Sequence, residues 1–322
     1  MRRSPIVAVG LVLVATLASR AGAGESLQIS DPSWSPDGKS IAFDARAGGS
    51  PSDIYTASVD GANLRNLTPD DPGWNELPSW SRRGSAIAYE TDLSGPLVAR
   101  VRYSVVAPDG SGRRDIALST AVGPIHWSAG DRYISFDGRF YAEALAVAST
   151  CCDSERLLSV GLSGPWAPRM MRVVISVERG NDAHLVTTSS TGTLRRRLTH
   201  GRESLRALAW SRDGRWILFE GARGGMSSFD LYVIRVTTGL VRRLAVGARV
   251  GTFSPDGKRV VYSMEKGGIY TASIDGRTRR SLSPDGFNPR WSPDGSWIAF
   301  QSGTEIELVH PDGSGRRPLL AP

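Results

Sequence analysis

The stretch that decides the fold is WSPDGSWIAF, which runs from Trp291 to Phe300. Closely similar phrases begin earlier in the chain, with WSPDGKSIAF at Trp34, WSRDGRWILF at Trp210 and FSPDGKRVVY at Phe253. Weaker copies start at Trp80 (WSRRGSAIAY), Trp127 (WSAGDRYISF) and Trp166 (WAPRMMRVVI). The starting points lie 38 to 47 residues apart. A repeat of about 40–45 residues that is rich in short strands and Gly, Pro and Asp turns is typical of a β-propeller blade.

A second phrase follows each aromatic one and contains an alternating strand, a DG or TG turn and a short closing strand. Its clear copies are DIYTASVDGANLRNLT from Asp53, HLVTTSSTGTLRRRLT from His184, DLYVIRVTTGLVRRLA from Asp230, IYTASIDGRTRRSLS from Ile269 and IELVHPDGSGRRPLL from Ile306. Together the two phrases predict four antiparallel strands per repeat. The repeats fill residues 24–322, so we expect one all-β propeller domain there, with seven four-stranded blades; six or eight blades are the alternatives.

The recurring side chains of the aromatic phrase are expected to be structural. Pro, Asp and Gly suit a tight β-turn, and their recurrence favours a turn role for Asp37, Asp213, Asp256 and Asp294 over a metal site. The repeated Trp is expected to fill the space between blades, because one large aromatic side chain buries about 150–250 Å².

The first 23 residues read as a signal peptide. Arg2 and Arg3 precede an apolar run from Ile6 to Ala18, and Ala21-Gly22-Ala23 offers small residues for cleavage. The apolar run is shorter than the roughly 20 residues that a bilayer span needs. We therefore expect export to the periplasm or out of the cell, with no transmembrane segment in the mature chain; an uncleaved anchor is the alternative.

The charge of the chain argues against a nucleic-acid partner, and its cysteine content argues against a stabilising disulfide. The net charge of +7 falls to +4 without Arg2, Arg3 and Arg20, and no basic cluster interleaved with stacking side chains predicts nucleic-acid binding. Cys151 and Cys152 are the only cysteines, and their Cα atoms are about 3.8 Å apart, which is below the usual disulfide range. We expect two buried thiols rather than a strained vicinal disulfide, and a monomer that needs no cofactor.

WSPDG followed by IAF, with an IY hairpin that ends in Arg and Leu-Thr, resembles the repeat of TolB-type β-propellers. The resemblance covers residues 27–322 and is strongest at Trp34, Trp210, Phe253 and Trp291. It implies an exported bacterial propeller that serves as a scaffold for protein partners. TolB carries an α/β domain before its propeller, whereas WSPDG here begins about ten residues after the expected cleavage site. The resemblance is therefore to the repeat, without the TolB N-terminal α/β domain, and a role in a Tol–Pal system does not follow from it.

Related propellers also occur in prolyl oligopeptidase-like peptidases and in lyases that act on uronic-acid sugars. The peptidases need a G-x-S-x-G nucleophile elbow, and no such pentapeptide occurs in this chain. The lyases need a metal-binding histidine cluster, and no spacing predicts one from the four histidines, His126, His184, His200 and His310. We therefore expect a non-enzymatic protein-binding module, with a metal-dependent polysaccharide lyase or a small-ligand sensor as the alternatives.

The loops before the aromatic strands differ most between repeats, and propellers bind ligands through such loops and across the central channel. The longest runs from Thr68 to Ser79 and is expected to present Trp74, Asn75 and Glu76 at its tip, which suits a peptide or a glycan. Alternatively, Trp74 packs over its own blade. Equivalent loops supply the other candidate binding residues, which are His126, Arg206, Arg249, Asn288 and Arg290.

An arginine recurs two positions before the closing-strand Leu or Ile of six blades. These arginines, called the rim arginines below, are Arg65, Arg114, Arg196, Arg242, Arg280 and Arg317. They predict either a basic belt with weak affinity for an anionic lipid or cell-wall polymer, or a structural role in which each side chain lies on a neighbouring aromatic ring. Their recurrence in register favours the structural role.

Overall fold

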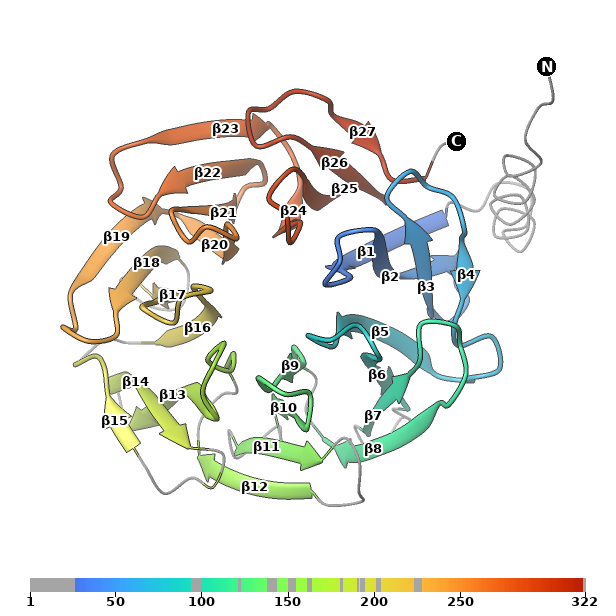
Figure 1. Cartoon of the computed structure of the whole chain (residues 1–322), viewed down its shortest axis with the longest axis horizontal. Helices are drawn as coiled ribbons and strands as arrows, with labels where there is room; N and C mark the ends of the chain where they lie inside the picture. The colour runs from blue at the N-terminus through green and yellow to red at the C-terminus, as the bar shows by residue number, and fades with distance from the viewer. Residues whose placement is uncertain are drawn as a thin grey trace.

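The computed structural model describes residues 27–93, 100–120, 123–137, 144–149, 155–160, 164–179, 182–189, 191, 195–200, 204–222 and 228–320. The expected signal peptide (residues 1–23) and the two cysteines, Cys151 and Cys152, lie outside these ranges. Within them, the strands form six four-stranded sheets and a seventh sheet of three strands, arranged as a ring around one axis (Figure 1). The predicted all-β propeller is therefore confirmed. No helix in these ranges is long and apolar enough to cross a membrane.

Each sheet is an antiparallel meander whose strands follow chain order, so one blade corresponds to one sequence repeat. Blade 1 contains β1 (Leu27–Trp34), β2 (Ser40–Ala47), β3 (Asp53–Ser58) and β4 (Arg65–Asn66). Blade 2 contains β5 (Trp74–Trp80), β6 (Ile87–Asp92), β7 (Val101–Val106) and β8 (Arg114–Ser119). Blade 3 contains β9 (His126–Trp127), β10 (Tyr133–Asp137), β11 (Ala144–Ser149) and β12 (Glu155–Val160).

The remaining blades continue the same order around the ring. Blade 4 contains β13 (Arg172–Arg179), β14 (Asp182–Ser189) and β15 (Arg195–Arg197). Blade 5 contains β16 (Leu205–Trp210), β17 (Trp216–Ala222), β18 (Phe229–Arg235) and β19 (Val241–Val246). Blade 6 contains β20 (Ala248–Phe253), β21 (Arg259–Met264), β22 (Ile269–Ser273) and β23 (Arg279–Ser283). Blade 7 contains β24 (Phe287–Trp291), β25 (Ile298–Ser302), β26 (Glu305–Val309) and β27 (Arg317–Pro318).

Blade 4 departs from the expected four strands. Trp166 pairs with Val173 of β13 through one isolated bridge, so the innermost segment of this blade does not form a strand in the described residues. Its aromatic phrase, WAPRMMRVVI, lacks the turn glycine that the phrases of all the other blades contain. In the remaining blades the strand that carries the aromatic residue lies nearest the axis, and the closing strand lies at the rim (Figure 1).

The turn of the aromatic phrase is held by its own side chains. Ser35 donates its hydroxyl to Asp37 Oδ1 over 2.6 Å, and the same oxygen accepts the Lys39 amide over 3.1 Å. Gly38 has a φ of 71°, which only glycine adopts freely. Equivalent Ser–Asp bonds of 2.5 to 2.6 Å recur at Asp213, Asp256 and Asp294. The structural role predicted for these aspartates is confirmed.

The repeated tryptophans join neighbouring blades. Three of their indole N–H groups donate to the backbone carbonyl that lies just before the aromatic residue of the preceding blade. These bonds run from Trp34 to Arg290 (3.2 Å), from Trp127 to Ser79 (2.9 Å) and from Trp210 to Pro165 (2.8 Å). The hydrophobic core is likewise divided among the blade interfaces: six of seven clusters of buried residues in the described ranges combine side chains from two adjacent blades. The seventh cluster lies in blade 4 and packs against the partly buried Tyr133 of blade 3. The predicted packing role of the Trp residues is confirmed.

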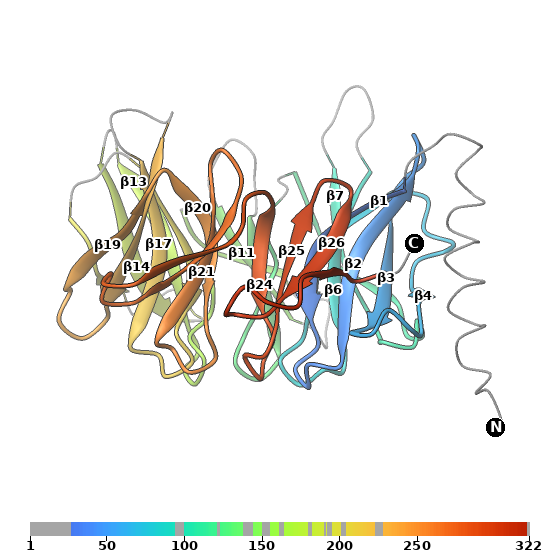
Figure 2. The ribbon, with the colours of Figure 1, turned by 90° about the horizontal axis from the view of Figure 1, so that it is seen from above.

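The ring closes without strand exchange, because β1 to β4 form the first blade and β24 to β27 the last. In place of a shared strand, individual hydrogen bonds cross the seam, which is the junction between blades 7 and 1. They run from Ile29 N to Thr304 O (2.8 Å), from Asn288 Nδ2 to Asp31 Oδ1 (3.0 Å) and from Arg317 Nη2 to Val59 O (2.7 Å). The backbones also approach closely here: a Cβ on Gly61 would lie 2.5 Å from the Leu319 carbonyl oxygen. Figure 2 shows the blades standing side by side around the ring.

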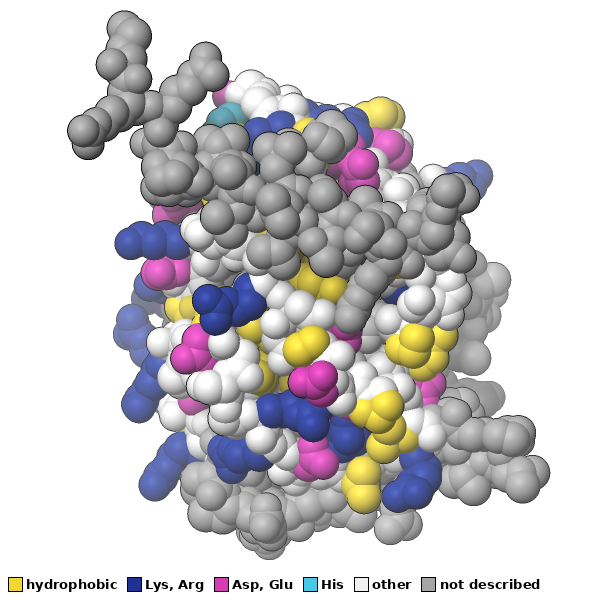
Figure 3. Space-filling view, turned by 90° about the vertical axis from the view of Figure 1, so that its right-hand side faces the viewer, with side chains coloured by type: hydrophobic (Ala, Val, Ile, Leu, Met, Phe, Trp, Pro, Cys, Tyr) yellow, Lys and Arg dark blue, Asp and Glu magenta, His cyan; other side chains and the backbone are white. Residues whose placement is uncertain are grey.

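The rim arginines mostly tie one blade to the next. Four of them donate to a backbone carbonyl of the following blade: Arg65 to Asp109 (2.8 Å), Arg196 to Thr237 (3.2 Å), Arg280 to Asp312 (2.7 Å) and Arg317 to Val59 (2.7 Å). Arg242 lies 5.8 Å from the ring centre of Trp216. The predicted stacking on an aromatic ring is confirmed for Arg242 and for Arg317, which lies 5.0 Å from the ring centre of Trp297. The bonds of Arg65, Arg196 and Arg280 are structural too, but they go to backbone carbonyls. Contact with an anionic surface stays a prediction. On the face shown in Figure 3, basic side chains alternate with acidic ones.

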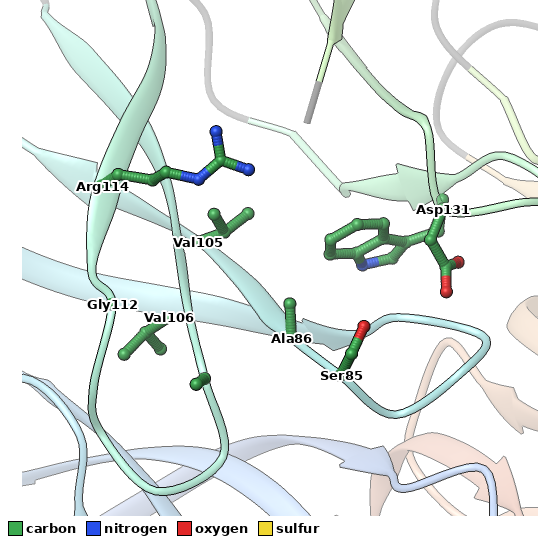
Figure 4. Close-up of a pocket in the computed structure, with 9 residues that line it drawn as sticks. Ser85, Ala86, Val105, Val106, Gly112, Arg114 and Asp131 are labelled. Atoms are coloured by element: carbon green, nitrogen blue, oxygen red, sulfur yellow. The ribbon is translucent and has the colours of Figure 1, made fainter. Parts of the chain in front are cut away.

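Arg114, the remaining rim arginine, borders a space of about 280 Å³ between blades 2 and 3. Figure 4 shows its guanidinium on one side of this space and Asp131 on the other. Asp131 is already engaged, since its carboxylate accepts the backbone amides of Arg82 (2.9 Å) and Arg83 (2.8 Å). This space therefore belongs to the joint between two blades.

Candidate functional site

The residues predicted to lie in binding loops instead belong to the innermost strands. Trp74, Asn75 and Glu76 begin β5, so their placement at a loop tip was wrong. The loop ends one residue earlier, at Gly73, where a Cβ would lie 2.1 Å from Thr91 Cγ2, and strand pairing starts with Trp74 opposite Asp92. The other candidate binding residues also lie in innermost strands: His126 in β9, Arg206 in β16, Arg249 in β20, and Asn288 and Arg290 in β24.

Two of the three candidates in β5 have structural contacts. Asn75 is fully buried, and its side chain accepts the Thr91 hydroxyl (2.8 Å) and donates to the Gly73 carbonyl (3.3 Å). Trp74 is half-buried and packs under the guanidinium of Arg46, which lies 5.4 Å from its ring centre. Arg46 belongs to β2 of blade 1, so this contact joins Trp74 to the neighbouring blade, and the alternative that Trp74 packs over its own blade stays a prediction. Glu76 is the β5 candidate that remains to be explained.

Five innermost strands carry a β-bulge at the same place. The pairing shifts in β1, β5, β16, β20 and β24, between the fourth residue before the aromatic residue and the aromatic residue itself. Four of these bulges contain a non-glycine residue with positive φ, including Leu77 (52°) and Val250 (43°). That conformation costs about 1–3 kcal/mol in a bulky residue, and bulges of this kind turn side chains at functional edges of sheets.

The bulge places one side chain from each of these strands at equivalent positions. The residue four before the aromatic residue pairs with the residue ten after it, which directly follows the repeated phrase. In three blades this second residue is acidic, giving the pairs Ser30–Asp44, Glu76–Glu90 and Arg206–Glu220. Sequence reasoning missed Asp31, Asp44, Glu90 and Glu220. The available signal was the recurrence of Asp or Glu immediately after IAF, IAY and ILF.

Four carboxyl groups gather on blades 1 and 2. This acidic cluster consists of Asp31, Asp44, Glu76 and Glu90. Burial, together with the charges of Asp31 and Glu76, raises the pKa of Asp44 to about 7. Burial likewise raises the pKa of Glu90 to about 8, aided by Glu76, although its carboxylate accepts the Gly123 amide over 3.2 Å. The pKa values of Asp31 and Glu76 are also raised by burial. A buried carboxylate is costly unless a positive charge compensates it.

Blades 5 and 6 present the opposite charge. The side chains of Arg206 and Arg249 are 40% and 45% exposed and approach the carboxylate of Glu220 at 3.9 and 3.8 Å. These distances are too long for hydrogen bonds, and Glu220 Oε2 is buried with no hydrogen-bond partner. Both guanidinium groups therefore keep donors free for a ligand.

Arg290 extends this basic side across the ring, and the uncharged imidazole of His126 lies near it. Burial, together with the positive charges of Arg206, Arg290 and Arg82, lowers the pKa of His126 to about 3. The imidazole is therefore neutral at neutral pH, and its Nε2 is buried with no hydrogen-bond partner. Burial and Arg206 also lower the pKa of Arg290, against the opposing effect of Asp31. His126, Arg206 and Arg290 come from blades 3, 5 and 7, yet they lie close enough for their charges to interact.

The other histidines lie elsewhere in the ring. His184 is buried in β14 beside Arg197 (2.8 Å), His200 is exposed, and His310 stacks on Trp297 with ring centres 3.7 Å apart. Among the residues that the structure describes, no three His, Cys, Asp or Glu side chains are placed to hold one metal ion. The inner face therefore offers an acidic side on blades 1 and 2 and a basic side on blades 5 to 7, which suits a ligand that carries both charges.

Comparison with known proteins identifies the repeat. Residues 11–212 match the family model described as the TolB beta propeller domain. The chain belongs to this family. The Tol-Pal system protein TolB of Francisella tularensis subsp. mediasiatica (strain FSC147) is 28% identical over 117 residues, which span 35% of this chain and 24% of that relative. The chain thus spans about a quarter of the length of the curated relatives that it matches first.

Solved structures support the fold. The putative TolB from Agrobacterium tumefaciens has a TM-score of 0.54 at 20% identity and covers 65% of this chain and 84% of that one. An oligogalacturonate lyase in complex with manganese has a TM-score of 0.68 at 14% identity and covers 88% of this chain and 89% of that one. At these identities the likeness concerns the propeller architecture, which TolB-type proteins share with an enzyme.

Proposed function

We propose that this protein is an exported, non-catalytic TolB-like propeller that binds a protein partner in the bacterial cell envelope or outside the cell. The partner would contact the innermost strands, where the acidic side and the basic side face the axis. The family assignment supports a TolB-like role, and the curated relatives that match first are TolB proteins of a Tol-Pal system. Export rests on the signal-peptide pattern of residues 1–23.

One observation carries this proposal. The position four before the aromatic residue has equivalent bulged backbone in five blades but bears different side chains: Ser30, Glu76, Arg206, Arg249 and Phe287. Phe287 is 47% exposed and adds an apolar contact to the charged ones. The repeated Trp, Ser and Asp side chains hold the blades and turns, so they need no ligand to explain them. Variation on a constant scaffold is what selective recognition of one partner requires.

A polysaccharide lyase is the enzymatic alternative, and here it rests on the architecture alone. Its metal site would need histidines that converge, whereas His126 lies in the innermost strand β9, His184 lies in β14 beside Arg197, and His310 follows β26 and stacks on Trp297. His310 in addition uses its Nδ1 on the Ser296 carbonyl (2.8 Å). We therefore propose binding without catalysis, and a small ligand would have to use the same inner strands.

The proposal is tested by affinity capture from an envelope extract of the source bacterium. We expect the double variant Arg206→Ala/Arg249→Ala to retain at most one fifth of the partner captured by the wild type, because each buried interfacial charge contributes about 1–3 kcal/mol. The matched control is Arg277→Ala/Arg215→Ala, which removes two exposed arginines from turns and is expected to capture normally. Equal capture by the wild type and both variants would refute binding at the inner strands.

A further inference from the structure

The acidic cluster contains a carboxylate oxygen that nothing in the protein satisfies. Asp44 is only 5% exposed, and its Oδ2 accepts the Ser30 hydroxyl over 2.6 Å. Its Oδ1 is buried and has no hydrogen-bond partner. Because an unpaired buried acceptor costs about 1–3 kcal/mol, a native protein rarely keeps one without a reason. Asp44 is therefore the point at which the cluster lacks a donor.

The equivalent positions of blade 5 show what is missing. There, Glu220 lies opposite Arg206 on the neighbouring strand, and Arg249 approaches from blade 6. In blade 2, Glu90 lies opposite Glu76, so two carboxyl groups face each other across β5 and β6. Like charges directly opposite each other destabilise a strand pair. Equivalent strand positions thus place an arginine opposite the carboxylate in blade 5 and a second carboxylate opposite it in blade 2.

The cations nearest to the cluster are engaged elsewhere. Arg46 donates its Nε to Gln28 (2.7 Å) and packs over Trp74, and it lowers the pKa of Glu76 only as a secondary effect. Arg290 faces Asp31 but donates to the Pro289 carbonyl (3.2 Å) and is repelled by Arg206.

Among the residues that the structure describes, the other groups recorded as facing the cluster carry no positive charge. They are Ser30, Ser52, Asn288, the Gly123 amide, Tyr103 and Asp92. The described residues therefore leave the cluster without a compensating cation.

We propose that the acidic cluster of Asp31, Asp44, Glu76 and Glu90 binds a lysine or arginine side chain of the partner protein. The inference rests on the proposed function and specifies the chemistry of its contact. Among the described residues, no three acidic side chains are placed to share one metal ion, whose ligand distances are at most about 2.6 Å. An ammonium or guanidinium group, which has three to five N–H donors, can reach acceptors that are farther apart.

Protonation supports the same ligand. Without a cation, the raised pKa values of about 7 for Asp44 and about 8 for Glu90 keep both groups largely protonated at pH 6. A bound cation favours the ionised form and lowers both pKa values, so binding releases protons. Affinity therefore rises with pH until the free groups have ionised, near pH 8 to 9.

The test is isothermal titration calorimetry of the mature chain with acetyl-tetralysine amide at constant ionic strength. We expect binding that tightens at least fivefold from pH 6 to pH 8.5. The double variant Asp44→Asn/Glu90→Gln is expected to weaken it at least tenfold. The matched control Glu220→Gln, which alters the equivalent carboxylate of blade 5, is expected to change it less than twofold. Circular dichroism confirms that each variant is folded.

Three outcomes would overturn the inference. They are the absence of tetralysine binding, equal binding of acetyl-tetraglutamine amide, and an equal loss of affinity in Glu220→Gln. Calcium binding that disappears in the double variant, in a protein that ignores tetralysine, would assign the cluster to a metal ion instead. Failure here is distinct from failure of the proposed function, since partner capture that still depends on Arg206 and Arg249 would leave the function standing.

Discussion

Replacing Trp34 by Ala is expected to lower the free energy of unfolding by about 3–5 kcal/mol. Trp34 is 9% exposed and packs in the cluster of buried residues between blades 7 and 1, which share no strand in the described part of the chain. Its indole also donates to the Arg290 carbonyl across the seam. The change removes both the apolar contact and this bond, and the measurement is urea denaturation followed by tryptophan fluorescence and circular dichroism.

Two further variants separate the causes. Trp34→Phe retains most of the apolar contact and loses the N–H donor, so we expect a loss of about 1–2 kcal/mol. Trp216→Ala is the matched control, because Trp216 is half-buried, lies outside the repeated position and stacks with Arg242. It is expected to cost about 1–2 kcal/mol. A Trp34→Ala variant no less stable than Trp216→Ala would contradict the packing role assigned to the repeated Trp.

The second large effect is a pH dependence of stability, of which Asp44→Asn is expected to remove the share that belongs to Asp44. The folded-state pKa of Asp44 is about 7 and that of Glu90 about 8, against ordinary values of 3.8 and 4.5. Between these limits the folded protein holds protons that the unfolded chain has released. The stability contributed by these groups is therefore complete below about pH 4 and declines as pH rises, and the loss is complete above about pH 8.

The Asp44→Asn variant is expected to be more stable than the wild type at pH 9, by up to about 4 kcal/mol, and similar to it at pH 4. Thermal and urea unfolding across this pH range, without added peptide, measure the effect. Glu305→Gln, which alters an exposed carboxylate, serves as the control and is expected to leave the profile unchanged. A wild-type protein whose stability rises between pH 5 and pH 8 because of Asp44 would contradict the burial assigned to this group.

The repeated phrase predicted the fold because each of its residues has a local task. Asp37 closes its own turn, and Trp34 packs against the adjacent blade, which is blade 7. Pattern and spacing were therefore sufficient to predict the fold. Blade 4 was the exception, since the phrase from Trp166 lacks the turn residues that would shape a full innermost strand.

The binding residues were found only in part, because their contacts are not local. Because turn-forming residues precede Gly73, the loop was predicted to extend too far along the chain. Trp74 and Asn75 instead lie in β5, where they pair with Asp92 and Thr91. Glu76 was found for its charge, but Asp44 was missed although it follows the phrase directly. Its importance depends on Asp31 and Glu76, and the latter belongs to another blade, so the repeat alone does not reveal it.

Photo-crosslinking in living cells tests most directly whether the inner strands bind the partner. Phe287 in β24 and Leu240 in the hairpin between β18 and β19 are similarly exposed, at 47% and 45%. Each is replaced in turn by p-benzoylphenylalanine, which is a conservative change at Phe287. We predict a discrete crosslinked protein from position 287, which weakens in the Arg206→Ala/Arg249→Ala background, and none from position 240. A crosslink from position 240 with none from position 287 would contradict the account and place the partner on the rim.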